Sequence, residues 1–448
     1  MSQLIKEAGA KANQSAVINP PLYSHKRAHR AALSSFMGAV VDWYDFLLYG
    51  IVAALVFNHQ FFPNISPSMG TLAAFATFGI GFLFRPLGGI VFGHFGDRIG
   101  RKKMLVLTVV LMGGSTVLIG LLPNFASIGW AAPVLLVVLR AIQGFAVGGE
   151  WGGAALMAVE SAPPGKKAFY SSGVQIGYGV GLMLATGSVS LIIYFFGNEA
   201  FHDWAWRIPF IASVALLLVA LWIRRHQEES TEFEQTVINA KQQAQRMPII
   251  EAISRHPKAF LYIIALRFAE LLTMYLVTNF ALNYSTQHLG MSSSVFLNIG
   301  LMVGAISCFT IPLFARIADR YARNKMGYRM MCVGGGIIGA LSAVPFFFAM
   351  EQGNVFWIYL CAILLANIAH DMVVSVHQPL FTEFFGTAYR YSGAGVGYQV
   401  ASIVGGGFTP FIAAALVTWY DGSWYPVAIY LMVGCLLTAL VAARMQRS

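Results

Sequence analysis

The sequence predicts an all-α membrane protein with twelve transmembrane helices in two pseudo-symmetric six-helix bundles. Three observations predict this fold. The 448 residues are 57% hydrophobic and only 11% charged, whereas soluble domains carry roughly 25% charged residues, and the mean hydropathy is +0.65. Long apolar runs recur along the whole chain, and positive charge is confined to alternate connections between them.

Each predicted helix rests on an apolar run, because about 20 mostly apolar residues are needed to cross a bilayer. Such runs occupy residues 33–57, 72–92, 104–122, 133–158, 168–194, 207–223, 259–283, 293–315, 330–350, 355–377, 392–418 and 424–443. The predicted organisation is an N-terminal tail (1–32), a six-helix bundle (33–223), a linker (224–258), a second six-helix bundle (259–443) and a C-terminal tail (444–448).

The distribution of positive charge predicts the orientation, since connections rich in Lys and Arg remain in the cytoplasm. The chain has 29 Lys and Arg residues, and all except Arg85, Arg140, Arg207 and Arg267 fall in the two tails or in the connections on one side. We therefore expect both termini and the linker in the cytoplasm. The net charge of +10 is then an orientation signal and gives no reason to expect nucleic acid as a partner.

An internal repeat supports two similar halves. Residues 93–103 (GHFGDRIGRKK) recur in degraded form at residues 315–325 (ARIADRYARNK). Glu160 and Glu383 keep nearly the same spacing, as do Tyr170 and Tyr391. Several echoes in the same order indicate two six-helix units related by duplication.

These motifs resemble the major facilitator superfamily along the whole chain. The loop at 97–102 (DRIGRK) is similar to the superfamily signature, and 140–144 (RAIQG) in the fourth span to a second one. A finer resemblance, to the metabolite:proton symporter family, lies at 42–46 (DWYDF), 84–89 (FRPLGG), 148–154 (GGEWGGA) and 206–210 (WRIPF). It is strongest to members that carry shikimate, and includes 367–372 (NIAHDM) and 389–399 (YRYSGAGVGYQ). The second copy of the loop signature departs from the pattern, with Ala315 and Ala322 in place of glycines.

The resemblance implies proton-coupled import of shikimate, a hydroxylated cyclic monocarboxylate, by alternating access. The antiporter signature is missing from the fifth span, where 173–179 (GVQIGYG) stands, and this favours symport. We expect a monomeric multi-pass protein of the bacterial inner membrane whose partners are shikimate, protons and lipid. No metal or cofactor is expected, since the four cysteines are widely spaced and no enzyme motif is present. The alternatives are symport of citrate, a ketoacid, proline or betaine, and a non-transporting membrane sensor.

Ionisable residues inside the spans require an explanation, because each costs about 2.5–3.5 kcal/mol on insertion scales. They are the carboxylates Asp42, Asp45, Glu150, Glu270 and Asp371, the arginines Arg85, Arg140 and Arg267, and the imidazoles of His370 and His377. Five carboxylates face three arginines, so some carboxylates lack a permanent counter-ion, and burial disfavours their charged form. The candidates for proton coupling are therefore Asp45, Asp42, Glu150, Glu270, Asp371 and His370.

Depth along the spans, at about 1.5 Å per residue, separates these charges into two layers. In the outer layer we expect Asp45 to pair with Arg140, as the superfamily pattern implies, with Arg140 in the anion site and Asp45 competing with substrate. A permanent structural ion pair is the alternative. In the inner layer we expect Arg85 near Asp42 and Glu150, and Arg267 near Asp371, His370 and Glu270. Either arginine binds the carboxylate or belongs to an inner gate.

Neutral polar residues at mid depth are candidates to bind the ring hydroxyls of such a substrate. They are Gln143, Gln175, Tyr178, Tyr275, Asn279, Asn367 and Gln399, together with Tyr44 and Tyr49. The alternative role for each is a hydrogen bond between helices. The resemblance also implies a conformational gate in the loop after the second span, formed by Asp97, Arg98, Arg101 and Glu160, for which an ordinary positively charged loop is the alternative.

Overall fold

The computed structural model describes residues 25–99, 101–160, 162, 165–225, 253–321, 326–385 and 390–445. Within these ranges the regular secondary structure is helical, with no strand. The predicted tails and linker lie largely outside the described residues. Side chains are also left undescribed at some helical positions, among them Asp97, Arg98, Arg101, Glu150 and Glu160.

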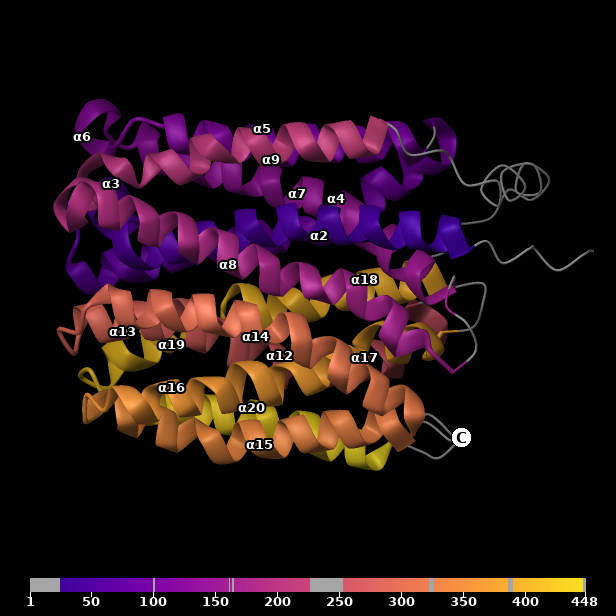
Figure 1. The fold of residues 1–448 in the computed structure, drawn as a ribbon. Coiled ribbons are helices and arrows are strands. Elements are labelled where there is room, and N and C mark those ends of the chain that lie inside the picture. Colours follow the sequence, from indigo (N-terminus) through magenta and orange to yellow (C-terminus); the bar gives the residue numbers. More distant parts are fainter. Residues whose placement is uncertain are drawn as a thin grey trace, which may run out of the picture.

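Residues 25–225 form a first group of helices. Their bounds are α2 (His25–Val52), the π-helical turn η1 (Ala53–Phe57), α3 (Asn58–Phe61), α4 (Pro67–Ile99), α5 (Arg101–Leu121), α6 (Phe125–Ile128), α7 (Ala131–Glu160), α8 (Lys167–Ala200), η2 (Phe201–Ala205) and α9 (Arg207–Arg225). Figure 1 shows these helices side by side in the upper part of the molecule.

Residues 257–444 form a second group. Its helices are α12 (Pro257–Tyr275), η3 (Leu276–Phe280), α13 (Ala281–Gln287), α14 (Ser293–Arg320), α15 (Met326–Glu351), α16 (Val355–Ile363), η5 (Leu364–Ala369), α17 (His370–Glu383), α18 (Arg390–Ser402), η6 (Ile403–Gly407), α19 (Thr409–Trp419) and α20 (Tyr425–Arg444). They occupy the lower part of Figure 1, with α18 reaching the boundary with the first group. The residues that begin α2 and end α20 lie at the same end of the molecule.

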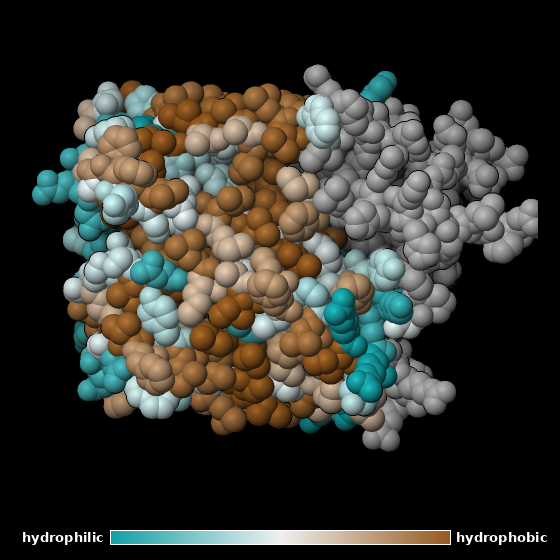
Figure 2. Space-filling model, viewed as in Figure 1, coloured by the Kyte–Doolittle hydropathy of each residue, from teal (hydrophilic) through white to brown (hydrophobic). Residues whose placement is uncertain are grey.

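Ten of the helical stretches in the described chain are long and apolar enough to cross a membrane. Two shorter apolar helices, Val106–Leu121 and Arg207–Trp222, coincide with the third and sixth predicted spans. Large hydrophobic side chains remain exposed on the flanks, including Tyr194, Phe309 and Leu341. Figure 2 shows hydrophobic residues over the middle of the viewed face and hydrophilic residues towards its ends. Such a surface suits lipid rather than water, and the chain is a multi-pass membrane protein.

Short connections join neighbouring helices at the end opposite the termini. Between α15 and α16, Gly353 adopts a φ of 64°, a left-handed conformation that ends a helix easily because glycine has no Cβ. The side chain of Asn354 then accepts a hydrogen bond from the Trp357 backbone N–H and so caps the first turn of α16. These two residues reverse the chain within a few positions, which keeps α15 and α16 antiparallel.

Small residues let α4 and α7 touch backbone to backbone. A Cβ added to Gly144 would overlap the Gly81 carbonyl, and one added to Gly148 would overlap the Arg85 carbonyl. Close approach of this kind is typical of glycine-containing interfaces between membrane helices. The contact has a direct effect on the interior, because it places Arg85 of α4 beside α7 and Arg140 of α7 against Gly81.

The two groups of helices meet through α8 with α14, and through α4 and α7 with α18. Near the end that holds the connecting loops, Asn283 Nδ2 donates to the Ala54 carbonyl over 2.7 Å. The π-helical turns η1 and η3 begin at residues 53 and 276, 223 residues apart, which is within one residue of the spacing of the sequence repeat. Because π-helical turns frequently occur at functional sites, this region is a candidate location for one.

Candidate functional site

Arg140 is the central residue of the candidate site and is fully buried on α7. Its guanidinium carbon lies 4.1 Å from the ring centres of both Phe46 and Tyr49 on α2. Nη1 donates to Gln143 Oε1, whereas Nε and Nη2 find no hydrogen-bond partner in the described part of the chain. The faces of the aromatic rings stabilise the cation. Two buried donors therefore remain available to an anion.

The direct ion pair expected between Asp45 and Arg140 does not form, so this prediction was wrong about the contact. Three hydrogen bonds connect the two residues instead: Arg140 donates to Gln143, Gln143 Nε2 donates to Thr116 Oγ1 over 2.7 Å, and Thr116 Oγ1 donates to Asp45 Oδ2 over 2.9 Å. The reason is the rotation of α2, which turns Asp45 towards α5 and presents the Phe46 and Tyr49 rings to the guanidinium.

Asp45 is itself enclosed, with 1% of its surface exposed. Its Oδ1 atom has no hydrogen-bond partner among the described residues. A buried carboxylate is stable as an anion only when it is paired and well hydrogen-bonded, and here Oδ2 receives a single neutral donor. Asp45 is therefore suited to carry a proton.

Arg85, on α4, shares one aromatic ring with Arg140. Its guanidinium carbon lies 3.9 Å from the centre of the Phe46 ring and 4.0 Å from that of Phe82. Its Nε atom has no hydrogen-bond partner in the ranges described. Of its two expected neighbours, Asp42 interacts with it electrostatically, and the side chain of Glu150 lies outside the described residues. Phe46 thus packs against two guanidinium groups at once.

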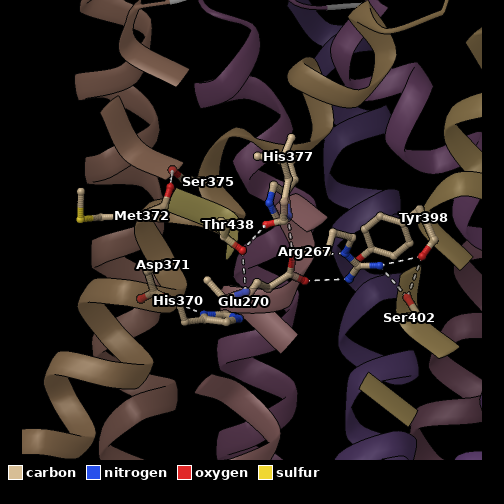
Figure 3. A network of polar contacts seen from close by, with 12 residues as sticks. Arg267, Glu270, His370, Asp371, Met372, Ser375, His377, Tyr398, Ser402 and Thr438 are labelled. Carbon is tan, nitrogen blue, oxygen red and sulfur yellow. Dashed lines mark hydrogen bonds and ion pairs between the residues drawn. The ribbon is translucent and has the colours of Figure 1, made fainter. Parts of the chain in front are cut away.

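Arg267, on α12, differs from the other two arginines because the second group of helices uses all its nitrogens (Figure 3). Nη2 and Nε donate to the Glu270 carboxylate over 2.7 and 3.3 Å. Nη1 donates to the Tyr398 carbonyl over 2.8 Å and to Ser402 Oγ over 2.6 Å. The guanidinium carbon also lies 3.4 Å from the centre of the Tyr398 ring. Arg267 therefore has little capacity to bind a substrate carboxylate.

Glu270 connects Arg267 with α17. Its Oε2 lies 2.5 Å from His377 Nδ1, at ion-pair distance but outside hydrogen-bond alignment, and the His377 ring stacks on Phe381 with centres 4.5 Å apart. Figure 3 shows Glu270 between the arginine and the imidazole. The expected neighbourhood of Arg267 and Glu270 is confirmed, and His377, which we had not assigned to the site, belongs to the same network.

Asp371 does not pair with Arg267, contrary to the expectation. Its carboxylate contacts His370 Nδ1 at 2.7 Å and accepts a hydrogen bond from Thr310 on α14. The reason is that Asp371 faces α14, while Glu270 already occupies the guanidinium from one turn away on α12. The His370 ring lies 4.9 Å from that of Tyr178 on α8, so this pair reaches the boundary with the first group of helices.

Several predicted neutral residues are buried and carry polar atoms without partners in the described ranges. These atoms are Gln175 Nε2, Tyr178 OH, Asn279 Nδ2, Asn367 Oδ1 and Gln399 Oε1. Gln143 instead uses both ends of its amide in the connection to Asp45. Asn367 Nδ2 donates to the Val303 carbonyl and to Ser307 Oγ, each over 2.9 Å, which is the inter-helix role we gave as the alternative.

Residues from both groups of helices converge on the arginines. Asn279 of η3 packs against Gly50 of α2, where an added Cβ would overlap its amide. The Tyr275 ring lies 5.5 Å from that of Phe78 and 5.9 Å from that of Phe82. Those two rings in turn lie against the arginines, with the guanidinium carbon of Arg85 4.0 Å from the Phe82 ring centre and that of Arg140 5.1 Å from the Phe78 ring centre. The candidate site therefore lies between the two groups.

The four predicted gate residues, Asp97, Arg98, Arg101 and Glu160, have no described side chains, so the gate stays a prediction. The second copy of the loop signature makes a contact that the sequence did not suggest. Asp319, near the end of α14, accepts hydrogen bonds from the backbone N–H groups of Ala168 and Phe169 over 3.1 and 2.8 Å. Arg316 lies over the Phe169 ring at 4.4 Å. This contact joins the start of α8 to α14 at the end that holds the termini.

Sequence reasoning missed Thr116, Phe46 and Asp319 as members of these networks. Thr116 is one of many hydroxyl residues in apolar spans and gives no signal of its own. Phe46 stands within the motif at 42–46, but only the two acidic residues of that motif were assigned a role. Asp319 was visible as the repeat partner of Asp97, but the loss of two glycines concealed its role. No group of three or more His, Cys, Asp or Glu side chains in the described ranges is placed to hold a metal ion.

The sequence profile of the Major Facilitator Superfamily matches residues 31–404. The chain is 66% identical to the "Shikimate transporter" of Escherichia coli K12, covering 95% of this chain and 96% of the relative. It is 32% identical to the "Proline/betaine transporter" of the same organism, covering 94% and 84%. A solved structure of the xylose transporter XylE from E. coli, in a partially occluded inward-open conformation, superposes with a TM-score of 0.72 at 18% identity, covering 93% and 97% of the two chains.

Proposed function

Because the chain belongs to the Major Facilitator Superfamily, whose curated relatives are transporters rather than enzymes, we propose that it imports shikimate together with protons. The identity of 66% to a shikimate transporter, against 32% to a proline/betaine transporter, supports this substrate over the alternatives. The same proposal includes twelve spans, two bundles at 33–223 and 259–443, cytoplasmic termini, a bacterial inner-membrane location and a monomer. The ten long and two shorter apolar helices support that count.

The observation that carries the proposal is the state of Arg140, a fully buried guanidinium with two nitrogens that have no hydrogen-bond partner among the described residues. Nε and Nη2 point along one edge of the guanidinium plane, the geometry that binds a carboxylate through two parallel hydrogen bonds. Arg267 lacks such an edge because Glu270 and α18 occupy its nitrogens. Of the three candidate arginines, Arg140 is therefore our choice for the substrate carboxylate, with Arg85 beside it across the Phe46 ring.

Shikimate adds three ring hydroxyls to its carboxylate, and each needs a partner when it leaves water. The polar atoms of Gln175, Tyr178, Asn279 and Gln399 that have no partner in the described ranges supply both donors and acceptors. They come from α8, η3 and α18 and thus from both groups of helices. A substrate held by Arg140 on one side and by η3 and α18 on the other would draw the two groups together, which is what alternating access requires.

Charge balance explains why a proton accompanies the substrate. Arg85 is balanced by Asp42 and Arg140 by the substrate carboxylate, so an ionised Asp45 would leave one uncompensated negative charge in a site that excludes water. A buried unpaired charge is costly, and protonation of Asp45 removes it. We assign the coupled proton to Asp45. Asp42, Glu150, Glu270, Asp371 and His370 are the other candidates, of which Glu270 is held by Arg267 and His377.

Uptake into proteoliposomes tests the function. Purified protein is reconstituted, an inward proton gradient is imposed, and accumulation of labelled shikimate above the external concentration is measured. We expect accumulation that disappears when a protonophore collapses the gradient, and none with Asp45→Asn, which retains exchange of labelled for unlabelled shikimate. Accumulation that persists without the gradient would overturn proton symport.

Two further measurements separate the alternatives. Unlabelled citrate, a ketoacid, proline and betaine are added in turn as competitors, and we expect shikimate to inhibit uptake at the lowest concentration. Binding of shikimate without any uptake in either direction would instead indicate a membrane sensor.

A further inference from the structure

Thr116 occupies a decisive position between the two charged residues of the proposed site. Its side chain is fully buried on α5, where it accepts a hydrogen bond from Gln143 Nε2 and donates one to Asp45 Oδ2. All three hydrogen bonds between Arg140 and Asp45 run in the same direction, with the donor on the arginine side. Changes in charge at one end are therefore felt at the other through polar groups that have already been oriented.

The hydroxyl of Thr116 has one proton but two acceptors at nearly equal distance. Asp45 Oδ2 lies 2.9 Å away and the Met112 carbonyl, one turn back on α5, lies 3.0 Å away. One proton serves only one acceptor well. A charged Asp45 attracts the proton more strongly than a carbonyl does, whereas a protonated Asp45 releases it to the backbone, the usual partner of a threonine inside a helix. The hydroxyl thus has two orientations, set by the charge of Asp45.

We propose that Thr116 is a positioning residue for proton coupling, whose hydroxyl reports the charge of Asp45 through Gln143 to the carboxylate-binding edge of Arg140. The inference rests on the proposed function, because it takes Arg140 as the anion site and Asp45 as the proton carrier. When substrate binds, Arg140 shares its charge with the substrate carboxylate and polarises Gln143 less. Thr116 then donates less strongly to Asp45, which favours uptake of a proton there.

Other charged groups near Asp45 do not replace this connection. Asp42 acts on Asp45 from the same helix, and Arg140 acts on it from α7. Arg85, on α4, acts on Arg140 and Asp42. These are interactions through space, and a change at Thr116 leaves them in place. The contribution of the hydroxyl can therefore be measured separately.

The test compares Thr116→Val, which keeps the shape and removes the hydroxyl, with Thr116→Ser, which restores it. Thr186→Val is the matched control, because Thr186 is buried and its hydroxyl, among the residues described, bonds only to the Leu182 carbonyl on its own helix. Infrared difference spectra of reconstituted protein are recorded against pH, and the Asp45 carboxyl band is identified as the one missing from Asp45→Asn. Proton-driven accumulation and substrate exchange are measured on the same preparations.

We expect Thr116→Val to move the midpoint of the Asp45 band about one pH unit higher, since a hydrogen bond to a charged group contributes about 1.5 kcal/mol or more and one unit corresponds to about 1.4 kcal/mol. Exchange should persist while accumulation falls. Thr116→Ser and Thr186→Val should match the wild-type protein. A wild-type midpoint in Thr116→Val, or a serine variant that behaves like the valine variant, overturns the inference.

A second variant, Gln143→Leu, tests the inference if Thr116→Val does not fold. Gln143→Leu cuts the connection on the arginine side and leaves the Thr116 hydroxyl facing Asp45. Because Gln143 no longer transmits the charge of Arg140, the substrate-free midpoint should rise towards the shikimate-bound value of the wild-type protein. Saturating shikimate should then cause a smaller further shift than in the wild-type protein, and a full wild-type shift overturns the inference. Because the substrate-free midpoint needs no transport, absence of shikimate uptake by the wild-type protein would defeat the proposed function without deciding the role of Thr116.

Discussion

The Arg140→Lys variant tests whether Arg140 binds the substrate carboxylate through the geometry of its guanidinium or serves only as a buried positive charge. Lysine keeps the positive charge but offers a point contact in place of the planar edge formed by Nε and Nη2. Neither nitrogen has a partner within the part of the chain that the structure describes, so in the lysine variant the substrate loses one of two charge-assisted hydrogen bonds. One such bond contributes about 1.5–3 kcal/mol, which corresponds to a roughly 10- to 150-fold weaker affinity.

Equilibrium binding of labelled shikimate to purified protein is the assay, because it does not depend on the rate of transport. Arg267→Lys is the control. Its nitrogens serve Glu270, Tyr398 and Ser402, so we expect lower thermal stability with affinity near that of the wild-type protein. Affinity retained in Arg140→Lys would refute the assignment, and a larger loss in Arg267→Lys than in Arg140→Lys would move the anion site to the second group of helices.

Three more outcomes follow from the contacts. Glu270→Gln leaves the Arg267 charge buried without its counter-ion, so we expect a loss of about 3–5 kcal/mol of stability, seen as a lower melting temperature in detergent; an unchanged melting temperature contradicts this. Gly144→Ala places a methyl group against the Gly81 carbonyl and should lower the melting temperature, whereas Gly114→Ala, where an added Cβ meets nothing within 4 Å, should not. Asp319→Asn should speed hydrogen exchange in the first turn of α8, and equal exchange rates in variant and wild type would mean that the contact contributes nothing.

Much of the fold could be predicted from the sequence because the bilayer restricts the choices. Long apolar runs have to be helices when they cross a membrane, so the helical stretches follow from composition. The pairing of Arg267 with Glu270 was also accessible, since residues three apart share a helix face. The rotation of α2 about its axis could not be predicted, because the sequence of a helix that is apolar on most sides says little about which side contacts which neighbour. The depth of Asp45 in the membrane predicted that it lies beside Arg140. The rotation of α2 instead directs its carboxylate to Thr116, which donates a hydrogen bond to it.

Contacts between segments far apart in the sequence could not be predicted for a similar reason. His377 meets Glu270 only because α12 and α17 pack together, and no local pattern records that packing. The role of Phe46 depends on two arginines from different helices. From the sequence, Phe46 is indistinguishable from an ordinary core residue, because the local sequence of α2 does not indicate a cation–π contact with arginines on other helices.

The matching π-helical turns η1 and η3 have a consequence for how the leading helix of each half is built. A π-helical turn accommodates one residue more than an α-helical turn, so both copies of the repeat contain the equivalent of a single-residue insertion at the same place. Deleting one residue there would rotate everything beyond it by about 100° relative to the part that carries Asp45 or Arg267. Asn283 would then turn away from the Ala54 carbonyl. The extra residue thus sets the rotation of the segment after each π-helical turn, which contacts the other group of helices through Asn283 and Ala54, relative to the segment before it, which carries the charged residues.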